Sequence, residues 1–258
     1  MTNSNRTLIF IPTYNEAENV EKLFFEIQSL AIDADVLFLD DNSPDGTGTI
    51  IDNLIKNQRG VFVIHRSGKL GIGSAHKAGI QWSYENKYNV LITMDCDFSH
   101  SPEYILDFIR HSSRDNIVIG SRYLEKHSLE TWNLFRKFLT HVGHFLTTTL
   151  LKMPYDSSGA FRLYNLNQIP RDMFNLIRSN GYSFFFESLY ILNFNKCTIY
   201  EFPISLPSRT YGSSKMAYKD IFMSLKYLGL IYLTSVFHKQ TFALKTADYQ
   251  LKYPIELE

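Results

Sequence analysis

Cysteine and net charge are both scarce in this sequence. Only two cysteines, Cys96 and Cys197, occur among 258 residues, which excludes a disulfide framework and indicates a reducing compartment. The 26 basic and 26 acidic residues cancel, which argues against nucleic acid as a partner. The sequence shows no internal repeat and no low-complexity linker. Because the first apolar run starts near Thr7, we expect no signal peptide.

Two common nucleotide-binding fingerprints are missing as well. No turn between a predicted strand and a predicted helix carries G-x-G-x-x-G. The glycine-rich stretch GKLGIGSAH also differs from the P-loop pattern G-x-x-x-x-G-K-[ST]. We expect its Gly71 and Gly73 to let the loop pass close to a ligand or to an adjacent helix. A bound diphosphate would then need positive charge from elsewhere.

Short apolar runs alternate with helical patterns along the first half of the chain. The runs cover residues 8–11, 36–39, 61–64, 90–94 and 117–119. After the first run, the turn PTYNEAEN leads into apolar residues at helical spacing, and similar patterns follow the later runs. This alternation predicts an α/β fold with a doubly wound, mostly parallel sheet.

Each of the five runs is followed by polar residues. In open α/β sheets, ligands bind outside the carboxyl ends of the strands. We therefore expect a ligand site where these ends meet. The polar residues at the five ends are Thr13, Tyr14, Asp40, Asp41, His65, Arg66, Asp95, Asp97, Ser121 and Arg122.

The stretch MDCD places Asp95 and Asp97 on either side of Cys96. Because side chains alternate along a strand, we expect both carboxylates to point to the same side. Two like charges held close repel each other unless a cation lies between them. Hard oxygen ligands suit Mg²⁺ or Mn²⁺. Chance also produces such pairs, as Asp33 and Asp35 do in a predicted solvated loop, but the position at a strand end favours a metal site.

Seven motifs carry a family resemblance. In order, they are IPTYNEAENV, LDDNSPDGT, MDCDFSHSP, GSRY, DSSGAFRLY, GYSFFFE and SRTYGSSK. Together they resemble the family-2 glycosyltransferases of the dolichyl- or polyprenyl-phosphate mannose synthase type, from about Leu8 to about Lys215. The resemblance implies an A-type glycosyltransferase fold, a sugar-nucleotide donor, a divalent metal, and transfer with inversion to a lipid phosphate.

The resemblance also assigns roles to individual positions. The implied nucleotide-sugar site comprises Pro12, Tyr14, Glu16, Leu39, Asp41, Asp95, Cys96, Asp97, Arg122, Arg209 and Lys215. The implied metal pair is Asp95 and Asp97. The implied catalytic residues are Asp97, Arg122, Arg209 and Lys215, and the implied acceptor-phosphate residues are Arg136 and Thr140. Each of these charged residues also has an ordinary explanation, as part of a surface turn or an exposed helix face.

Two positions in the nucleotide motifs have specific alternatives. Asp41 can accept the adjacent N1–H and N2–H donors of guanine together, or the N3–H of uracil. Asp40 or Asp45 is instead expected to cap the following turn. Ser99 stands where a close family member has a glutamine near the metal, so that contact does not carry over.

The implied reaction transfers a hexose, in the first instance mannose from GDP-mannose, to a polyprenyl or dolichyl phosphate. A phosphate monoester, with a second pKa near ~6, already carries a nucleophilic oxygen, so no general base is required. Asp156 and Glu187 would be bases only for a hydroxyl acceptor, and we expect them to orient other groups. The alternatives are a family-2 enzyme that uses a UDP-sugar or a saccharide hydroxyl in cell-surface polysaccharide synthesis, and a non-catalytic sugar-nucleotide-binding protein.

The C-terminal part of the sequence suggests a membrane surface. The apolar stretch over residues 221–237 is shorter than the ~20 residues that span a bilayer, and it contains Lys226. From Arg209 to Lys245, six basic residues accompany one acidic residue, an excess of five positive charges that suits anionic lipid. With a second helix near residues 132–150, we expect a peripheral protein on the cytoplasmic face, although both helices can also be core.

We divide the chain into a catalytic domain, 1–215, and its helical extension, 216–258.

Overall fold

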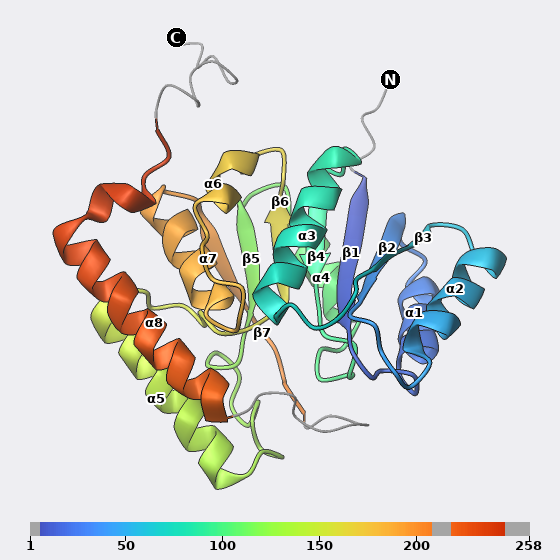
Figure 1. The fold of residues 1–258 in the computed structure, drawn as a ribbon, viewed down its shortest axis with the longest axis horizontal. Helices are drawn as coiled ribbons and strands as arrows, with labels where there is room; N and C mark the ends of the chain where they lie inside the picture. Colours follow the sequence, from blue (N-terminus) through green and yellow to red (C-terminus); the bar gives the residue numbers. More distant parts are fainter. Residues whose placement is uncertain (1–5, 208–217, 246–258) are drawn as a thin grey trace.

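The computed structural model describes residues 6–207 and 218–245. Its centre is a seven-stranded sheet with the order β3-β2-β1-β4-β6-β5-β7 (Figure 1). The strands are β1 (Thr7–Thr13), β2 (Ala34–Asp40), β3 (Val61–His65), β4 (Val90–Thr93), β5 (Ile117–Ser121), β6 (Arg162–Asn165) and β7 (Ile199–Pro203). Neighbouring strands are parallel except where β6 pairs with β4 and β5. The mostly parallel α/β sheet predicted from the five apolar runs is confirmed.

Helices cover both faces of this sheet. They are α1 (Val20–Ser29), α2 (Thr47–Asn57), α3 (Ile72–Glu85), α4 (Tyr104–His111), α5 (Leu134–Leu151), α6 (Arg171–Asn175), α7 (Phe184–Phe194) and α8 (Tyr218–Phe237), followed by a 3-10 turn at Lys239–Phe242. Successive side chains of β1 enter different cores, as expected for a strand buried on both faces. Phe10 joins the core under α3 and α7, whereas Ile9 and Ile11 join the core under α1, α2 and α4.

The strand β6 runs against its neighbours in the sheet. It pairs antiparallel with β4 and with β5, so that Thr93 and Ile119 both lie opposite Arg162. The beginning of β6 therefore lies at the same edge as the ends of the other strands. The turn that enters β6, residues 156–161, is thereby brought to the edge where a ligand site is expected.

The helices α5 and α8 lie side by side at one end of the molecule (Figure 1). The apolar stretch over residues 221–237 is part of a longer helix, because Tyr218, Lys219 and Asp220 form its first turn. Asp220 suits that position since acidic side chains are favourable near a helix N-terminus. At 20 residues, α8 is the one helix in the described part of the chain that is long and apolar enough to cross a membrane. The argument that this helix is too short to span was therefore wrong.

The apolar surface of α5 and α8 is largely uncovered. Of α8, only Leu228 and Ile231 are buried, and of α5 only Thr147 and Leu151. The exposed large apolar residues on the two helices are Leu134, Phe135, Phe138, Phe145, Tyr218, Phe222, Met223, Leu225, Leu230, Tyr232, Leu233, Val236 and Phe237. We call this set the α5/α8 apolar face. Such a surface is larger than scattered surface residues would produce and indicates an interaction with another apolar phase or partner.

Two helical glycines offer a matched test of how tightly the core is packed. A Cβ at Gly79 of α3 would lie 2.5 Å from the Phe10 ring, whereas a Cβ at Gly143 of α5 would meet nothing within 4 Å. In Gly79→Ala the cost of overpacking should exceed the gain in helix propensity. We expect the free energy of unfolding to fall by about 1–3 kcal/mol. Gly143→Ala is expected to raise it by roughly 0.5–1 kcal/mol. Urea unfolding of both variants measures this, and equal effects would contradict the packing described.

Candidate active site

The carboxyl ends of β1 to β5 meet at one edge of the sheet because these five strands run in the same direction. At the ends of β2 and β3, Asp41 and Arg66 lie close together because Asp40 pairs with His65 in the register of the two strands. Arg66 forms a bidentate ion pair with Asp41. Its Nε donates to Oδ1 of Asp41, and one of its terminal nitrogens donates to Oδ2 at 2.7 Å. Both side chains are only 10% exposed. The sequence analysis placed both residues at the edge but missed their pairing.

Two neighbouring aspartates have local structural roles. The carboxylate of Asp40 accepts hydrogen bonds from the backbone N–H of Ser43 at 3.1 Å and from its hydroxyl at 2.5 Å. Asp45 accepts from the backbone N–H of Thr47 at 3.0 Å and from its hydroxyl at 2.6 Å, at the start of α2. The expectation that these two aspartates cap turns is confirmed, which leaves Asp41 as the carboxylate of this motif paired with an arginine.

The end of β1 and the turn after it contain three residues expected to contact the nucleotide. Pro12 is half-buried, and Tyr14 carries the ammonium group of Lys69 above its ring at 4.3 Å. The carboxylate of Glu16 accepts a hydrogen bond from the Asn19 side chain at 2.7 Å. Tyr14 thus lies on the accessible side of this turn, whereas Glu16 is buried and contributes to its local structure.

Leu39, also expected near the base, lies in the core of β2. Its side chain is fully buried, and its carbonyl accepts a hydrogen bond from the Thr13 hydroxyl at 3.1 Å. A contact between Leu39 and a ligand would therefore involve the backbone. The Leu39 side chain stabilises the strand that carries Asp41.

The loop after β4 carries the expected metal pair. Because β4 ends at Thr93, strand alternation does not govern Asp95 and Asp97, and the argument that it makes them point to one side was wrong. Phe98, with φ of 59°, turns the chain here. Asp97 is 3% exposed, and its Oδ1 accepts from the Ser99 backbone N–H at 3.1 Å and the Ser99 hydroxyl at 2.6 Å. These bonds fix the orientation of the Asp97 carboxylate.

Asp95 and Cys96 complete this loop. The backbone N–H of Asp95 donates to Nδ1 of His100 at 3.0 Å, which holds the start of the loop against this ring. The side chain of Asp95 is more exposed than that of Asp97, and Cys96 is buried in the core. Asp95 therefore extends from a rigid loop toward the edge of the sheet.

The chemistry of Asp95 and Asp97 fits a hard divalent cation. Within residues 6–207 and 218–245, no group of three or more His, Cys, Asp or Glu side chains is arranged to hold a metal. Mg²⁺ commonly takes only one or two protein carboxylates and completes its shell with water and substrate phosphates. Two carboxylates at the edge of the sheet therefore suit a metal that a nucleotide diphosphate helps to bind.

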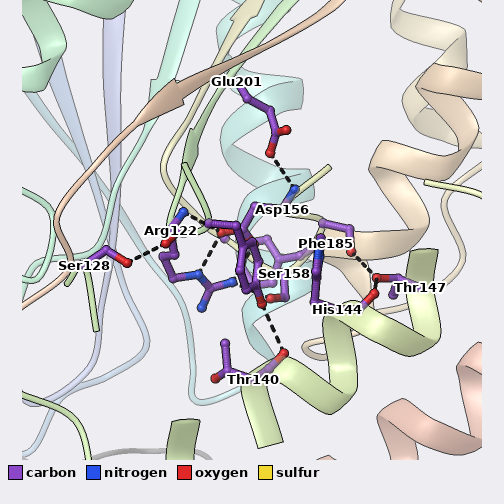
Figure 2. Close-up of polar contacts among 12 residues, drawn as sticks. Arg122, Ser128, Thr140, His144, Thr147, Asp156, Ser158, Phe185 and Glu201 are labelled. Atoms are coloured by element: carbon purple, nitrogen blue, oxygen red, sulfur yellow. Dashed lines mark hydrogen bonds and ion pairs between the residues drawn. The ribbon is translucent and has the colours of Figure 1, made fainter. Parts of the chain in front are cut away.

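Arg122 and Asp156 form a buried ion pair at the end of β5 (Figure 2). The guanidinium of Arg122 binds both oxygens of Asp156, at 2.8 and 2.5 Å, and the backbone N–H of Arg122 donates to the same carboxylate at 3.0 Å. Ser158 accepts a further hydrogen bond from Arg122 at 2.5 Å. The backbone N–H of Asp156 in turn donates to Glu201 of β7 at 2.8 Å. The turn before β6 thus fixes the arginine of the GSRY motif.

The charges of this pair stabilise each other. Burial alone would raise the pKa of Asp156, but the adjacent Arg122 outweighs burial and holds that pKa below its usual value. Burial would lower the pKa of Arg122, but Asp156, and more weakly Asp95, raise it. Asp156 is therefore an ionised partner of Arg122 and a poor proton acceptor. The expectation that Asp156 orients another side chain is confirmed by these contacts.

The expected acceptor residues lie on the first half of α5. Asn133 caps this helix by accepting from the backbone N–H of Arg136 at 2.8 Å, and the Arg136 guanidinium lies 3.4 Å above the centre of the Trp132 ring. The carbonyl of Thr140 accepts from the Tyr123 hydroxyl at 3.1 Å (Figure 2). Tyr123 directly follows Arg122, so this bond connects α5 to the ion pair.

A cavity of about 380 Å³ opens between Arg122 and α5. Its lining includes Tyr123, Lys137 and His141 as well as Glu125 and Glu130. Lys137 and His141 are the residues of α5 in this lining, which includes neither Arg136 nor Thr140. Arg209 and Lys215, the remaining two expected catalytic residues, lie outside the described residues.

The chain matches the family model described as glycosyl transferase family 2 over residues 8–181. It belongs to glycosyl transferase family 2. Among curated proteins, a polyprenol monophosphomannose synthase of Mycolicibacterium smegmatis is 32% identical over 223 residues, which cover 84% of this chain and 83% of that protein. An undecaprenyl-phosphate mannosyltransferase of Micrococcus luteus is 33% identical over 213 residues, which cover 82% of this chain and 88% of that protein. The predicted family is confirmed, and this chain is a glycosyltransferase.

Solved structures show the same fold. Glucosyl-3-phosphoglycerate synthase from Mycobacterium tuberculosis, solved with Mn²⁺, UDP and phosphoglyceric acid, aligns with a TM-score of 0.63 at 15% identity over 90% of this chain and 78% of that chain. The mannosyltransferase PcManGT from Pyrobaculum calidifontis was solved with GDP-mannose and Mn²⁺. It aligns with a TM-score of 0.50 at 13% identity, over 98% of this chain and 82% of that chain. The A-type glycosyltransferase fold expected from the motifs is confirmed by these likenesses.

Breaking the buried ion pair is expected to be costly. Asp156→Asn leaves the Arg122 charge buried without a counter-charge and should lower the free energy of unfolding at pH 7 by about 3–5 kcal/mol. Asp107→Asn, in the exposed pair with Arg110, is the matched control and should change it by no more than about 1 kcal/mol. Urea unfolding measures both.

The same pair predicts a pH dependence. Since folding lowers the pKa of Asp156 from 3.8, its ionisation stabilises the folded state above about pH 4, and this contribution is lost as the pH falls through the folded pKa. The stability difference between the wild type and Asp156→Asn should therefore shrink in acid. A difference that grows with acidification would contradict the pairing.

Proposed function

We propose that this enzyme transfers mannose from GDP-mannose to a polyprenyl or dolichyl phosphate, with inversion and with Mg²⁺ or Mn²⁺ as cofactor. The names of the two curated relatives support a mannosyl donor and a polyprenyl-phosphate acceptor, because each is similar to this chain over more than four-fifths of its length. Family membership supports a nucleotide-sugar donor.

The observation that carries the choice of acceptor is that both candidate general bases are already engaged. Asp156 is ion-paired with Arg122, and Glu187 accepts hydrogen bonds from two backbone N–H groups and from Tyr227. A hydroxyl acceptor needs a placed base, whereas a phosphate monoester, with a second pKa near ~6, supplies its own nucleophilic oxygen at neutral pH. Since Asp156 and Glu187, the two carboxylates that the motifs offer as bases, are both engaged, a phosphate acceptor suits this site better than a hydroxyl.

The transfer then depends on positioning and charge stabilisation. The phosphate oxygen attacks the anomeric carbon as the bond to the nucleoside diphosphate breaks on the opposite face, and no proton has to move. Asp95 and Asp97 would hold the metal, which when bound neutralises charge on the diphosphate. Arg122, fixed by Asp156, is close enough to Asp95 to interact with it and faces the same leaving group. The sequence motifs assign Arg209 and Lys215 to the diphosphate as well.

The acceptor phosphate is placed beside α5 in this proposal. Arg136 and Thr140 are on this helix, and the cavity next to Arg122 opens toward it. Arg136 lies above the Trp132 ring, and this contact limits the conformations of its long side chain. An anion that enters beside α5 would therefore meet a guanidinium that is already held in place.

Asp41 is proposed to read the donor base. The Arg66 prongs occupy one acceptor position on each Asp41 oxygen, and a carboxylate has further lone-pair positions for the N1–H and N2–H donors of guanine. A uridine nucleotide is the competing donor, because Asp41 can also accept a single N3–H.

The α5/α8 apolar face is proposed to lie on the cytoplasmic surface of a membrane. Lys219, Lys226 and Lys239 are exposed on or next to α8, and basic residues beside exposed apolar side chains favour anionic lipid. A peripheral position is supported by the packing of α8 against α5 and the 3-10 turn, which makes α8 an extension of the catalytic domain. Both free cysteines suit the reducing cytoplasm.

Donor and acceptor are tested by transfer assays with the full chain. GDP-mannose with undecaprenyl phosphate and Mn²⁺ should give lipid-linked mannose, whereas UDP-glucose as donor, undecaprenol as acceptor, or removal of the metal should not. Asp97→Asn should lower the rate by on the order of 10² or more, because charge on the leaving group is no longer neutralised. Asp107→Asn on the exposed face of α4 should keep wild-type activity. Transfer to a saccharide hydroxyl in place of the lipid phosphate would contradict the proposal.

Membrane association is tested by vesicle co-sedimentation. The full chain should bind vesicles of phosphatidylglycerol and be released by high salt or mild detergent. The double substitution Phe138→Ser and Phe222→Ser, at side chains that are 63% and 68% exposed, should weaken binding by about tenfold or more. Phe25→Ser, at a residue on α1 that is 47% exposed, is the control and should not. A wild type that binds no vesicle even with donor and metal, or that leaves the membrane only when the bilayer is dissolved, would contradict a peripheral position.

A further inference from the structure

Glu187 is a buried carboxylate that the transfer step does not use. It lies in the first turn of α7 and is 2% exposed. One of its oxygens accepts from the backbone N–H of Arg178 at 3.0 Å and from the Tyr227 hydroxyl at 3.1 Å, and the other accepts from the backbone N–H of Ser179 at 2.8 Å. Glu187 therefore joins the loop before α7 to both α7 and α8.

The held loop, residues 178–181, packs without spare room against the start of α3. The carbonyl of Asn180 accepts from the backbone N–H of Ser74 at 3.0 Å. A Cβ at Gly71 would lie 2.4 Å from that carbonyl oxygen, and a Cβ at Gly73 would lie 2.6 Å from Cβ of Phe184. The expectation that these two glycines allow a close approach is confirmed, and a shift of residues 178–181 must shift the first turn of α3 with it.

The first turn of α3 in turn holds the arginine at the base-binding end of the site. The hydroxyl of Ser74 accepts a hydrogen bond from Arg66 at 2.7 Å. The remaining guanidinium nitrogens of Arg66 bind Asp41. A continuous series of packed backbone and hydrogen bonds therefore runs from Glu187 through Asn180, Ser74 and Arg66 to Asp41.

We propose that Glu187 is a positioning residue for the base-binding end of the donor site. It touches neither the donor nor the reacting atoms, and it acts by holding residues 178–181, which fix the Ser74–Arg66 contact and hence the orientation of Asp41. The inference rests on the proposed function in one respect, that Asp41 faces the nucleotide base. It predicts that loosening Glu187 weakens binding of the nucleotide and leaves the acceptor side and the chemical step unchanged.

The first experiment measures equilibrium binding of GDP and, separately, UDP to the full chain, each with Mn²⁺. Glu187→Gln keeps one oxygen, so one of the three donors must face an amide NH₂ group, and binding of the preferred nucleotide should weaken roughly tenfold. Tyr227→Phe, which removes one donor and is more certain to fold, should weaken it about threefold. Tyr232→Phe, the same change at an exposed position of α8, should have no effect.

A purely structural role for Glu187 predicts a different pattern. Leu54→Ala, which opens a cavity in the core under α2, serves as a destabilised control that lies outside this series of contacts, and its nucleotide affinity should equal that of the wild type. In steady-state assays, Tyr227→Phe should raise KM for the donor and leave kcat and KM for the acceptor unchanged. Equal losses of affinity in Tyr227→Phe and Leu54→Ala, or no loss in Tyr227→Phe, would overturn the inference.

A double-mutant cycle tests the route through Ser74. Ser74→Ala removes the hydroxyl that Arg66 contacts and should weaken nucleotide binding on its own. If Glu187 acts through Ser74, the two losses of nucleotide affinity do not add. The double variant Ser74→Ala with Tyr227→Phe should then have the same nucleotide affinity as whichever single variant binds nucleotide less tightly. Losses that multiply would overturn the route.

Hydrogen exchange tests the same inference without a nucleotide. Tyr227→Phe should speed exchange of the backbone N–H groups in residues 178–181 and also in residues 72–76, whereas Tyr232→Phe should change neither segment. If the wild type bound neither GDP nor UDP, the proposed function would fail. The exchange rates would still show whether Glu187 and Tyr227 hold the start of α3 through residues 178–181. Faster exchange confined to residues 178–181, or identical behaviour of the two tyrosine variants, would overturn the inference.

Discussion

The ion pair of Arg122 and Asp156 holds together the parts of the chain that form the site. Arg122 follows β5, Asp156 enters β6, and Glu201 of β7 binds the backbone of Asp156. Removing either charge would leave the other buried and uncompensated, so the three strand ends are constrained together. The arginine next to the loop that carries Asp95 and Asp97 therefore has one orientation before any ligand arrives, and less of the binding free energy is spent on ordering it.

This constraint also bears on the chemistry proposed for the site. The carboxylates of Asp156 and Glu187 are both engaged, one by an arginine and one by a loop and a helix. The site is thus built to position charged groups, and a reaction whose nucleophile is already deprotonated suits it. The α5/α8 apolar face includes residues of α5, the helix that carries the proposed acceptor residues Arg136 and Thr140, and in the proposed function the lipid approaches there.

Much of the fold could be predicted from the sequence because strand ends in a parallel sheet share an edge, and five runs ended in polar residues. Other features depend on contacts that periodicity does not encode. The pairing of Asp41 with Arg66 requires knowing that β3 lies beside β2. The helix α7 contains nine consecutive buried residues, so it shows no amphipathic pattern. The alternation of strand side chains was extended to Asp95 and Asp97 at the strand end, whereas the chain leaves β4 at Thr93 and turns at Phe98.

The reversed strand β6 makes the site unusually sensitive to chain length at one point. Its four residues, Arg162–Asn165, are buried on both faces of the sheet, and the turn before them carries Asp156 and Ser158. Side chains on a strand alternate, so one inserted residue between that turn and β6 would exchange the faces on which Arg162 and Leu163 lie. Arg162 donates to the carbonyls of Ser157, Gly159 and Phe185, and on the opposite face it would lose these acceptors. An insertion that a surface loop tolerates would therefore be damaging within residues 156–162, where the spacing itself determines the contacts of Arg162.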